Sequence, residues 1–350
     1  MALTINTNIS SIIAQRSLNS ATNLMNTSIE RMSTGYKINH AKDNAAGYSI
    51  ANQWETKLGS LDVAADNAAT GSDMLTTAEE TYGLLVSHLQ RVRDLTEQAA
   101  NGTYGSQSLK AIHSEVYARL QEVSRLSANS EFNGIKLMAY IDGTEGSGIT
   151  SAGVNLQVGL YADVNSTINL SADLFKNASI SGLFDGLLTK TSSTSTHNLG
   201  DLLKEADKEG TGVKDILNTE KGMAIFAAAC CGLIADVTED ATTKKITSEA
   251  YTLQDDGEYG AKEMLEHLDS AINDISSRVT KIGAVQNRVE SAMEALDVQS
   301  QNLTSSLSTL RDTDVASESS NYIQQQILQQ ASATLLSTAN QLPSIALNLI

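Results

Sequence analysis

The most regular apolar pattern in the chain lies near its C-terminal end. Between residues 265 and 310, apolar side chains recur at alternating spacings of three and four, with Gln286 and Ser300 as the polar exceptions. This seven-residue repeat predicts one helix of roughly 70 Å, at about 1.5 Å per residue, supercoiled left-handedly with a partner. Residues 61–99 keep the same alternation with many small residues, so they supply the partner helix.

A third helix and a hairpin are predicted after this first heptad segment. Apolar residues fall on one face over about 106–128, which indicates an amphipathic helix. Asn133-Gly134 is a turn signal. The alternating apolar residues of 154–160, followed by a second apolar pair in 168–170, predict a β-hairpin.

The middle of the chain loses both periods. Residues 171–258 are rich in Gly, Ser and Thr. We expect a small α+β insert there, with short helices at about 198–208 and 220–236 and a strand near 246–254.

The expected fold is therefore mainly α. Long heptad helices from the N- and C-terminal thirds must pack together to bury their seams, with a β-hairpin region and the α+β insert between them. This makes the architecture discontinuous. The expected domains are a terminal helical domain of 1–43 and 311–350, a coiled-coil domain with the hairpin of 44–170 and 259–310, and a surface-exposed insert of 171–258.

Both chain ends are patterned as amphipathic helices that almost lack charge. Residues 1–29 hold one charged side chain, Arg16, and the last charged side chain of the sequence is Glu318. The polar faces consist of Asn, Gln, Ser and Thr, which can be packed against protein without stripping water from an ion. Two ends of this kind indicate helices that other copies of the same chain surround.

The apolar positions of these ends are the expected self-assembly contacts. They recur three or four residues apart, as on one helix face. The residues we assign to self-assembly are Ile5, Ile9, Leu18, Met25, Ile323, Ile327, Leu335 and Leu342.

Composition and charge exclude several other classes of protein. The 41 acidic against 24 basic residues give a formal charge of −17, which argues against binding to a nucleic-acid backbone. The longest apolar run, Met223 to Ala235, is too short to span a bilayer, so no membrane contact is expected. No secretory signal peptide is visible, because the first positive side chain is Arg16 and no apolar segment follows it.

Catalytic and metal chemistry find little support in the residues. The adjacent Cys230 and Cys231 are too close for an ordinary disulfide, so we expect buried free thiols. None of the five histidines is paired at metal-ligand spacing, and Glu263 to His267 favours a solvated helix face over a metal site. We therefore expect no enzyme activity, no cofactor and no metal.

Motifs at both ends occur together in one protein family. The N-terminal motifs are SIERMSTG at 28–35, AKDNAAG at 41–47, QAANGT at 98–103 and EFNG at 131–134. The C-terminal motifs are GAVQNR at 283–288, RDTD at 311–314 and ANQLP at 339–343. Through these motifs the chain resembles bacterial flagellin, the subunit of the flagellar filament, over roughly 1–140 and 260–350. A departure is Arg311, an extra positive charge before the terminal helix, from which we infer no loss of assembly.

The resemblance implies a secreted structural protein that polymerises into the extracellular flagellar filament for motility. In flagellins the two termini pair to form the inner core tubes, and the free monomer's termini are expected to be disordered. The implied partners are other copies of the chain, an export chaperone with the flagellar type III export apparatus, and the filament cap and hook-junction proteins. The nearest alternative is a minor hook–filament junction protein, which would lack the full 90–103 block.

The resemblance also implies recognition of the monomer by the innate immune receptor Toll-like receptor 5. The matching contact positions are Gln90, Arg91, Leu95, Gln98 and Glu115. Arg91, Leu95 and Gln98 are spaced by four and three, so they would share one helix face, and an Arg beside an exposed Leu is a common interface anchor. The alternative is a surface ion pair between Arg91 and Glu115 with little energetic weight.

Overall fold

The structure is a computed structural model that describes residues 8–138, 149, 153–161, 163–176, 178–184, 220–231, 233–239, 246–253 and 257–347. The chain forms two compact units, which we call the terminal unit (1–63 and 296–350) and the central unit (64–295). Both boundaries fall inside long helices, α2 (Ala45–Ala99) and α9 (Gly257–Arg311). The three-domain division expected from the sequence stays a prediction.

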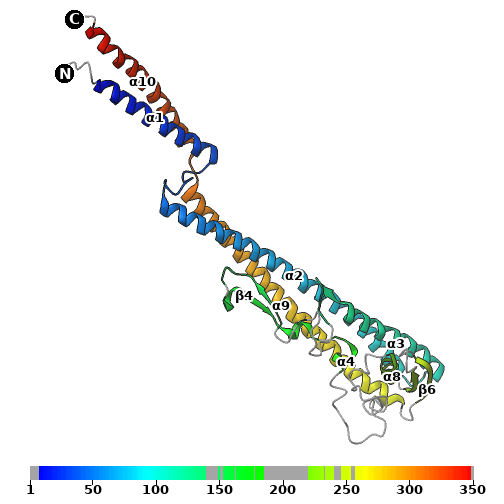
Figure 1. The fold of residues 1–350 in the computed structure, drawn as a ribbon. Coiled ribbons are helices and arrows are strands. Elements are labelled where there is room, and N and C mark those ends of the chain that lie inside the picture. The colour runs from blue at the N-terminus through cyan, green and yellow to red at the C-terminus, as the bar shows by residue number, and fades with distance from the viewer. Residues whose placement is uncertain are drawn as a thin grey trace. The chain divides into compact units, whose positions relative to one another are not determined.

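The terminal unit contains an antiparallel pair of helices, α1 (Ile9–Thr34) and α10 (Val315–Leu347), which Figure 1 shows side by side. α1 begins where the Asn8 side chain accepts a hydrogen bond from the Ser11 amide, and it ends at Gly35, whose φ of 77° suits glycine. α10 begins where an Asp314 carboxylate oxygen accepts from the Ala316 amide at 2.9 Å. A polar side chain therefore caps the start of each helix, and Gly35 ends α1 at the junction with α2 and α9.

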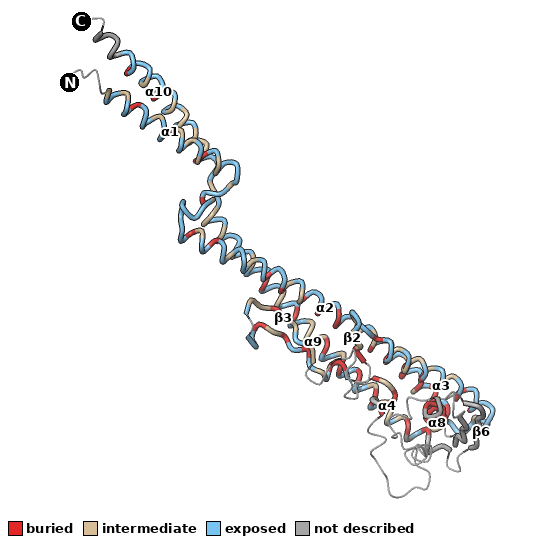
Figure 2. The backbone as a smooth tube through the Cα atoms, in the orientation of Figure 1, coloured by how far each residue is buried: buried red, intermediate tan, exposed pale blue. Residues whose placement is uncertain are grey.

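The central unit is built on α2 and α9. Every position of the predicted α2 register from Leu61 to Ala99 is buried, and all of them except Leu61 lie in this unit. Gln286 donates to Glu79 across the pair at 2.9 Å, and Arg93 pairs with Asp269. These contacts run in opposite directions along the two helices, so the pair is antiparallel. Figure 2 shows the buried residues of this unit concentrated along the facing sides of the helices. The predicted pairing of the two heptad segments is confirmed.

A third helix, α3 (Ser106–Asn129), packs against α2 and confirms the helix predicted over 106–128. Its apolar face is buried, and the buried side chains include Val116, Leu120 and Val123. Arg91 on α2 pairs with Glu115 on α3, and Ser130, just after α3, donates to Thr81 on α2, so the two helices are also antiparallel neighbours. α2 is thus covered on two flanks over this part of its length.

Two small hairpins follow α3. β1 (Glu131–Phe132) and β2 (Ile135–Lys136) are joined by Asn133 and Gly134, whose φ angles of 49° and 80° are those of a two-residue hairpin turn. β3 (Val154–Gln157) pairs antiparallel with β4 (Thr167–Leu170), as the alternating pattern predicts. The second hairpin lies against α2, because a Cβ added at Gly71 would overlap the side chain of Leu156.

Short elements complete the central unit. A single-turn 3₁₀ segment, Val164–Ser166, lies between β3 and β4, and a second one, Ala172–Phe175, follows β4 before the short helix α4 (Ile180–Leu183). The later part contains α8 (Glu220–Cys230) and the antiparallel strands β5 (Leu233–Glu239) and β6 (Ile246–Leu253). The strand predicted near 246–254 is confirmed, while the helix predicted at 198–208 lies outside the described residues. With long N- and C-terminal helices packed together and small hairpins in the middle, the fold is mainly α, as predicted.

The helix predicted over 220–236 is wrong in its second half. It ends at Cys230, and residues 233–239 form a strand that pairs with β6. The sequence favours this break, because Gly232 disfavours helix while Ile234 and other β-branched residues favour strand. The apolar run from Met223 to Ala235 is therefore divided between two elements rather than forming one core helix.

Although α8 belongs to the insert that we expected to be exposed, it is buried in the core of the central unit. Phe226 and Ala227 are fully covered. His113 of α3 places Nε2 3.1 Å from the carbonyl oxygen of Ala224, which ties α8 to the helical core.

Candidate assembly surface and receptor face

The side chains that are fully buried between α1 and α10 are small or polar. The buried residues of α1 are Ala14, Ala21 and Ser28, spaced by seven. On α10, Glu318, Ser332 and Ala339 are the buried residues, again at multiples of seven. Small residues at this spacing let two helix backbones approach closely along one seam.

Hydrogen bonds between uncharged groups join this seam. The Asn8 side chain donates from Nδ2 to the Ala339 carbonyl oxygen at 2.7 Å. Farther along, Gln329 Nε2 donates to the hydroxyl of Thr22 at 3.0 Å. An ion pair is present near the junction end of the pair, where Arg31 lies 3.9 Å from the buried Glu318. The polar side chains that make these contacts therefore lie between α1 and α10 rather than on the outside of the helix pair.

The outer face of the pair carries the large apolar side chains. On α10, Ile327 is 61% exposed and Leu335 is 62% exposed. The other large exposed apolar residues of the two helices are Ile9, Ile12, Ile13, Leu24, Ile29, Met32, Val315, Ile323 and Leu328. Figure 2 shows both helices mostly in the colour of exposed residues. An apolar face of this extent, on helices that nearly lack charge, is typical of an interaction surface.

The residues expected to mediate assembly lie mainly on this outer face. Ile9, Ile323, Ile327 and Leu335 are exposed, whereas Leu18 and Met25 are partly buried. Ile5 lies outside the described residues, and so does the side chain of Leu342. The apolar register read from the C-terminal sequence thus does not form the seam with α1.

A compact junction joins the two helix pairs of the terminal unit. Backbone bonds link its two chain segments, from the Lys37 amide to the Arg311 carbonyl at 2.7 Å and from the Thr313 amide to the Gly35 carbonyl at 2.8 Å. The Arg311 side chain is 19% exposed and lies 3.1 Å from a Glu55 carboxylate oxygen. The extra positive charge noted in the sequence is therefore partnered within the same unit.

The predicted receptor face lies on α2 and α3 of the central unit. Arg91 Nε donates to Glu115 at 2.8 Å, and this hydrogen bond lowers the pKa of the Glu115 carboxyl. Gln98 Nε2 donates to the Tyr104 hydroxyl at 2.8 Å, and Gln90 is exposed. The structure therefore brings four of the five predicted residues to the surface and contains the ion pair of the alternative interpretation.

Leu95 is only 2% exposed, so the expectation of an exposed Leu beside Arg91 is wrong. α2 is covered by α9 on one flank and α3 on the other, which widens its buried stripe. Leu95 lies beside the seam positions Val92 and Ala99, and all three are buried. The spacing of Arg91, Leu95 and Gln98 does not give one exposed face.

Cys230 and Cys231 are free and buried, as predicted. Burial raises the pKa of the Cys230 thiol to about 12, although a hydrogen bond with Thr96 opposes the shift, and burial also raises the pKa of Cys231. Within the described part of the chain, no group of three or more His, Cys, Asp or Glu residues could hold a metal ion. No helix described here is long and apolar enough to cross a membrane.

Sequence reasoning missed two features of the terminal unit. One is the packing of Tyr36 against Arg311 in the junction. The other is a groove that contains the chain's one tryptophan, Trp54. The second could have been found, because Trp54 lies seven residues before Leu61 and so continues the α2 register.

Comparisons with known proteins cover the whole chain. Residues 5–142 match the family model for the bacterial flagellin N-terminal helical region, and residues 265–350 match that for the C-terminal helical region. Polar flagellin F of Vibrio parahaemolyticus is 32% identical over 376 residues, and flagellin B of Vibrio cholerae is 31% identical over 375. Each alignment covers 100% of both chains. Flagellin C of Vibrio anguillarum is similar to the same degree, at 32% over 390 residues.

Proposed function

This chain belongs to the bacterial flagellin family, and on that premise we propose that the outer face of α1 and α10 is the surface through which its copies polymerise. Members of the family are structural, non-enzymatic subunits of the extracellular flagellar filament that drives motility. The coarse function of the chain is therefore that of a filament subunit. The proposal concerns which of its residues make the polymer.

One observation carries the proposal: the fully buried residues of the terminal pair are small or polar, whereas most of its large apolar residues are exposed on the outside. A helix pair that worked alone in water would reverse this arrangement. Complete burial of a side chain such as Ile327 or Leu335 stabilises an assembly by about 1.5–3 kcal/mol. Because residues after Glu318 carry no charged side chain, neighbouring copies can cover the α10 part of this face without desolvating ions.

Seeded elongation of purified monomer tests the proposal. The double substitution Ile323→Lys and Ile327→Lys places two ammonium groups on the outer face, so we expect no growth from sheared wild-type filaments. The control replaces the same two residues with Leu, which keeps the face apolar and should elongate at close to the wild-type rate. Elongation of the Lys variant at the wild-type rate would contradict the proposal.

The remaining partners follow from the same surface and stay proposals. Before assembly the apolar outer face of α10 needs cover, which an export chaperone would supply while the type III apparatus secretes the chain. The filament cap and the hook-junction proteins would meet the same face at the two ends of the polymer. Competition between a chaperone and filament seeds for monomer is the expected result, and simultaneous binding would count against this assignment.

We further propose that the monomer is recognised by Toll-like receptor 5 through Gln90, Arg91, Gln98 and Glu115. The supporting observation is that these side chains are exposed or half-exposed on adjacent helices, and that hydrogen bonds hold Arg91 and Gln98 in place. Leu95 would support this face from beneath, since it is buried.

A matched pair of arginine variants tests receptor binding. Arg91→Ala should weaken binding of monomer to the receptor ectodomain at least several-fold. Arg125→Ala is the control, because Arg125 is an exposed α3 residue in a similar ion pair with Glu122 and lies outside the proposed set. Equal dissociation constants for the two variants would remove the receptor assignment and leave the Arg91–Glu115 pair as a surface ion pair.

A further inference from the structure

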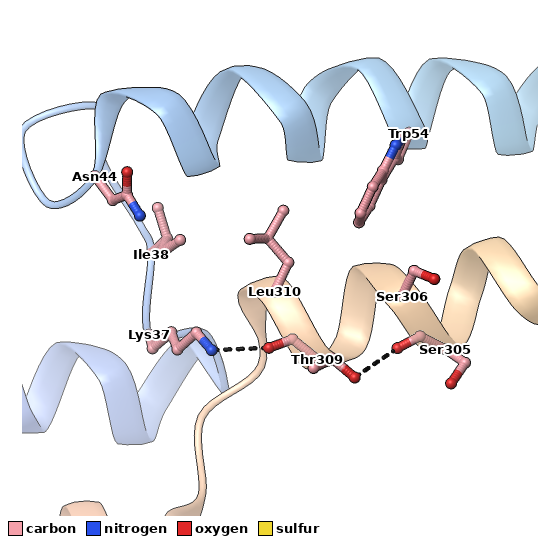
Figure 3. Close-up of a pocket in the computed structure, with 8 residues that line it drawn as sticks. All are labelled: Lys37, Ile38, Asn44, Trp54, Ser305, Ser306, Thr309 and Leu310. Atoms are coloured by element: carbon pink, nitrogen blue, oxygen red, sulfur yellow. Dashed lines mark hydrogen bonds between the residues drawn. The ribbon is translucent and has the colours of Figure 1, made fainter.

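A groove of about 530 Å³ lies between α2 and α9 in the terminal unit. Its apolar walls are Ile38, Trp54 and Leu310. Figure 3 shows Trp54 pointing from α2 toward α9, and Leu310 pointing from α9 back toward α2, with Ile38 on the other side of Leu310. The heptad pattern of α2 and α9 continues from the central unit into this region, but here the side chains at the heptad positions leave a groove between the two helices.

Hydrogen bonds hold the polar residues around this groove in place. Lys37 Nζ donates to the Thr309 carbonyl oxygen at 2.8 Å, as Figure 3 shows. The Asn44 side chain accepts from the Gly47 amide at 2.9 Å and so caps the start of α2. No carboxylate lines the groove, and the ammonium of Lys37 is turned to a backbone carbonyl. The lining therefore suits an uncharged, apolar side chain.

Comparison with the central unit indicates that the groove lacks a covering layer. There, α3, α8 and the hairpins join α2 and α9, and seam residues such as Leu75 and Leu89 are fully buried. In the terminal unit the described elements besides α2 and α9 are α1 and α10, which pair with each other. The α9 seam residues Leu303, Leu307 and Leu310 remain partly exposed.

The ends of the same chain cannot supply the missing layer. α1 has 26 residues and extends about 39 Å from the junction, while residues 1–7 reach about 25 Å at most. α10, with 33 residues, extends about 50 Å from the junction. A second copy of the chain can reach the groove, and the protein works as a homopolymer.

We propose that a neighbouring copy inserts an apolar side chain into this groove when the filament assembles, and that Trp54 is covered by that contact. The inference rests on the proposed assembly through α1 and α10 and adds a second, separate interface within the same unit. The inference gives a function to the incomplete packing between α2 and α9. This packing defect lowers the stability of the monomer, and the side chain of the neighbouring copy fills it in the polymer.

Trp54 is the one tryptophan of the chain, so its fluorescence reports on the groove directly. Acrylamide quenching would be measured on full-length monomer and on filaments grown from sheared seeds of the same protein. We expect quenching several-fold weaker in filaments, together with a blue-shifted emission maximum. Equal quenching in monomer and in filaments would overturn the inference. So would a Trp54 already shielded in the monomer, because its own chain or a bound small molecule would then fill the groove.

A groove-filling variant gives an independent measurement. Ser306→Phe places a ring of the same chain in the groove, so it should slow seeded elongation several-fold while the circular dichroism of the monomer is unchanged. The control, Ser308→Phe, changes an exposed α9 residue that does not line the groove. Equal elongation of both variants would count against the inference.

The two proposals fail in different ways. If filaments grow and Trp54 stays accessible in them, the groove contact alone is wrong. If wild-type monomer does not elongate seeds at all, the assembly proposal is contradicted and the groove contact with it.

Discussion

The guanidinium carbon of Arg311 lies 4.1 Å from the centroid of the Tyr36 ring, a cation–π contact between the two chain segments that connect the helix pairs of the terminal unit. Tyr36 lies between α1 and α2, and Arg311 is the last residue of α9. The same guanidinium reaches Glu55 on α2. One side chain therefore joins both connections to the start of α2.

Removing this side chain should loosen the junction. Arg311→Ala loses a cation–π contact of about 0.5–2 kcal/mol and a partly exposed ion pair of up to about 1 kcal/mol. Hydrogen exchange of the Lys37 and Thr313 amides should then be about tenfold faster, since about 1.4 kcal/mol corresponds to a factor of ten. Arg288→Ala, an exposed arginine elsewhere on α9, should leave these amides unchanged. Unchanged exchange in Arg311→Ala would mean that the backbone bonds alone hold the junction.

Two helical glycines of α2 should respond oppositely to the same substitution. A Cβ at Gly83 meets open space, so Gly83→Ala should stabilise the helix by about 0.5–1 kcal/mol. At Gly71 the Cβ overlaps the side chain of Leu156 on β3, so Gly71→Ala must shift this side chain and disturb the packing of the β3–β4 hairpin on α2. We expect a lower thermal midpoint for Gly71→Ala than for Gly83→Ala, and faster hydrogen exchange across Val154–Gln157. Equal midpoints would show that the hairpin does not depend on this contact.

Substitutions at Leu95 and at Arg91 should differ in their effect on stability, because Leu95 is a packing residue and Arg91 is a proposed receptor contact. Leu95→Ala removes a buried side chain and should lower the free energy of unfolding of the central unit by about 2–5 kcal/mol. Arg91→Ala removes an exposed ion pair and should change it by less than about 1 kcal/mol. Denaturant unfolding followed by circular dichroism compares the two. A stable Leu95→Ala protein would contradict the burial of Leu95 between α2, α3 and α9.

Because Cys230 and Cys231 are buried as neutral thiols, we predict that the packing of α8 in the core weakens at alkaline pH. Their pKa values are raised from the ordinary value of 9.0, to about 12 for Cys230, because burial disfavours the thiolate. The protonated thiols therefore stabilise the fold below about pH 9, and this contribution is lost as the pH rises from about 9 toward 12. Native protein at pH 8 should resist iodoacetamide, and protein in denaturant should react rapidly. Fast labelling of the native protein would mean that α8 is not held in the core.

The long helices could be predicted because their signals are periodic and local. The α2 register from Leu61 to Ala99 and the third helix both agree with the structure, since each position repeats the same choice of face many times. The Asn133-Gly134 turn was equally recognisable, because few residues tolerate positive φ. For the helices, the sequence signal coincides with the residues that the tertiary structure buries, and for the turn it coincides with the residues that take positive φ.

The sequence-based predictions were wrong where burial or secondary structure depends on contact with another element of the chain. Leu95 is buried because α3 covers a flank of α2 that the heptad pattern treats as open. The end of α8 depends on strand pairing between β5 and β6, which periodicity in one segment cannot reveal. The apolar register of α10 marks a face that α1 does not cover, so the seam of the pair had to be read from Ala and Ser instead.

Hydrogen exchange on full-length monomer and on filaments tests the central claim most directly, namely that other copies of the chain complete the terminal helices. The account predicts rapid exchange of the α1 and α10 amides in the monomer and strong protection in the filament, while the α2 and α9 amides of the central unit are protected in both. Equal protection of α1 and α10 in monomer and filament would contradict it.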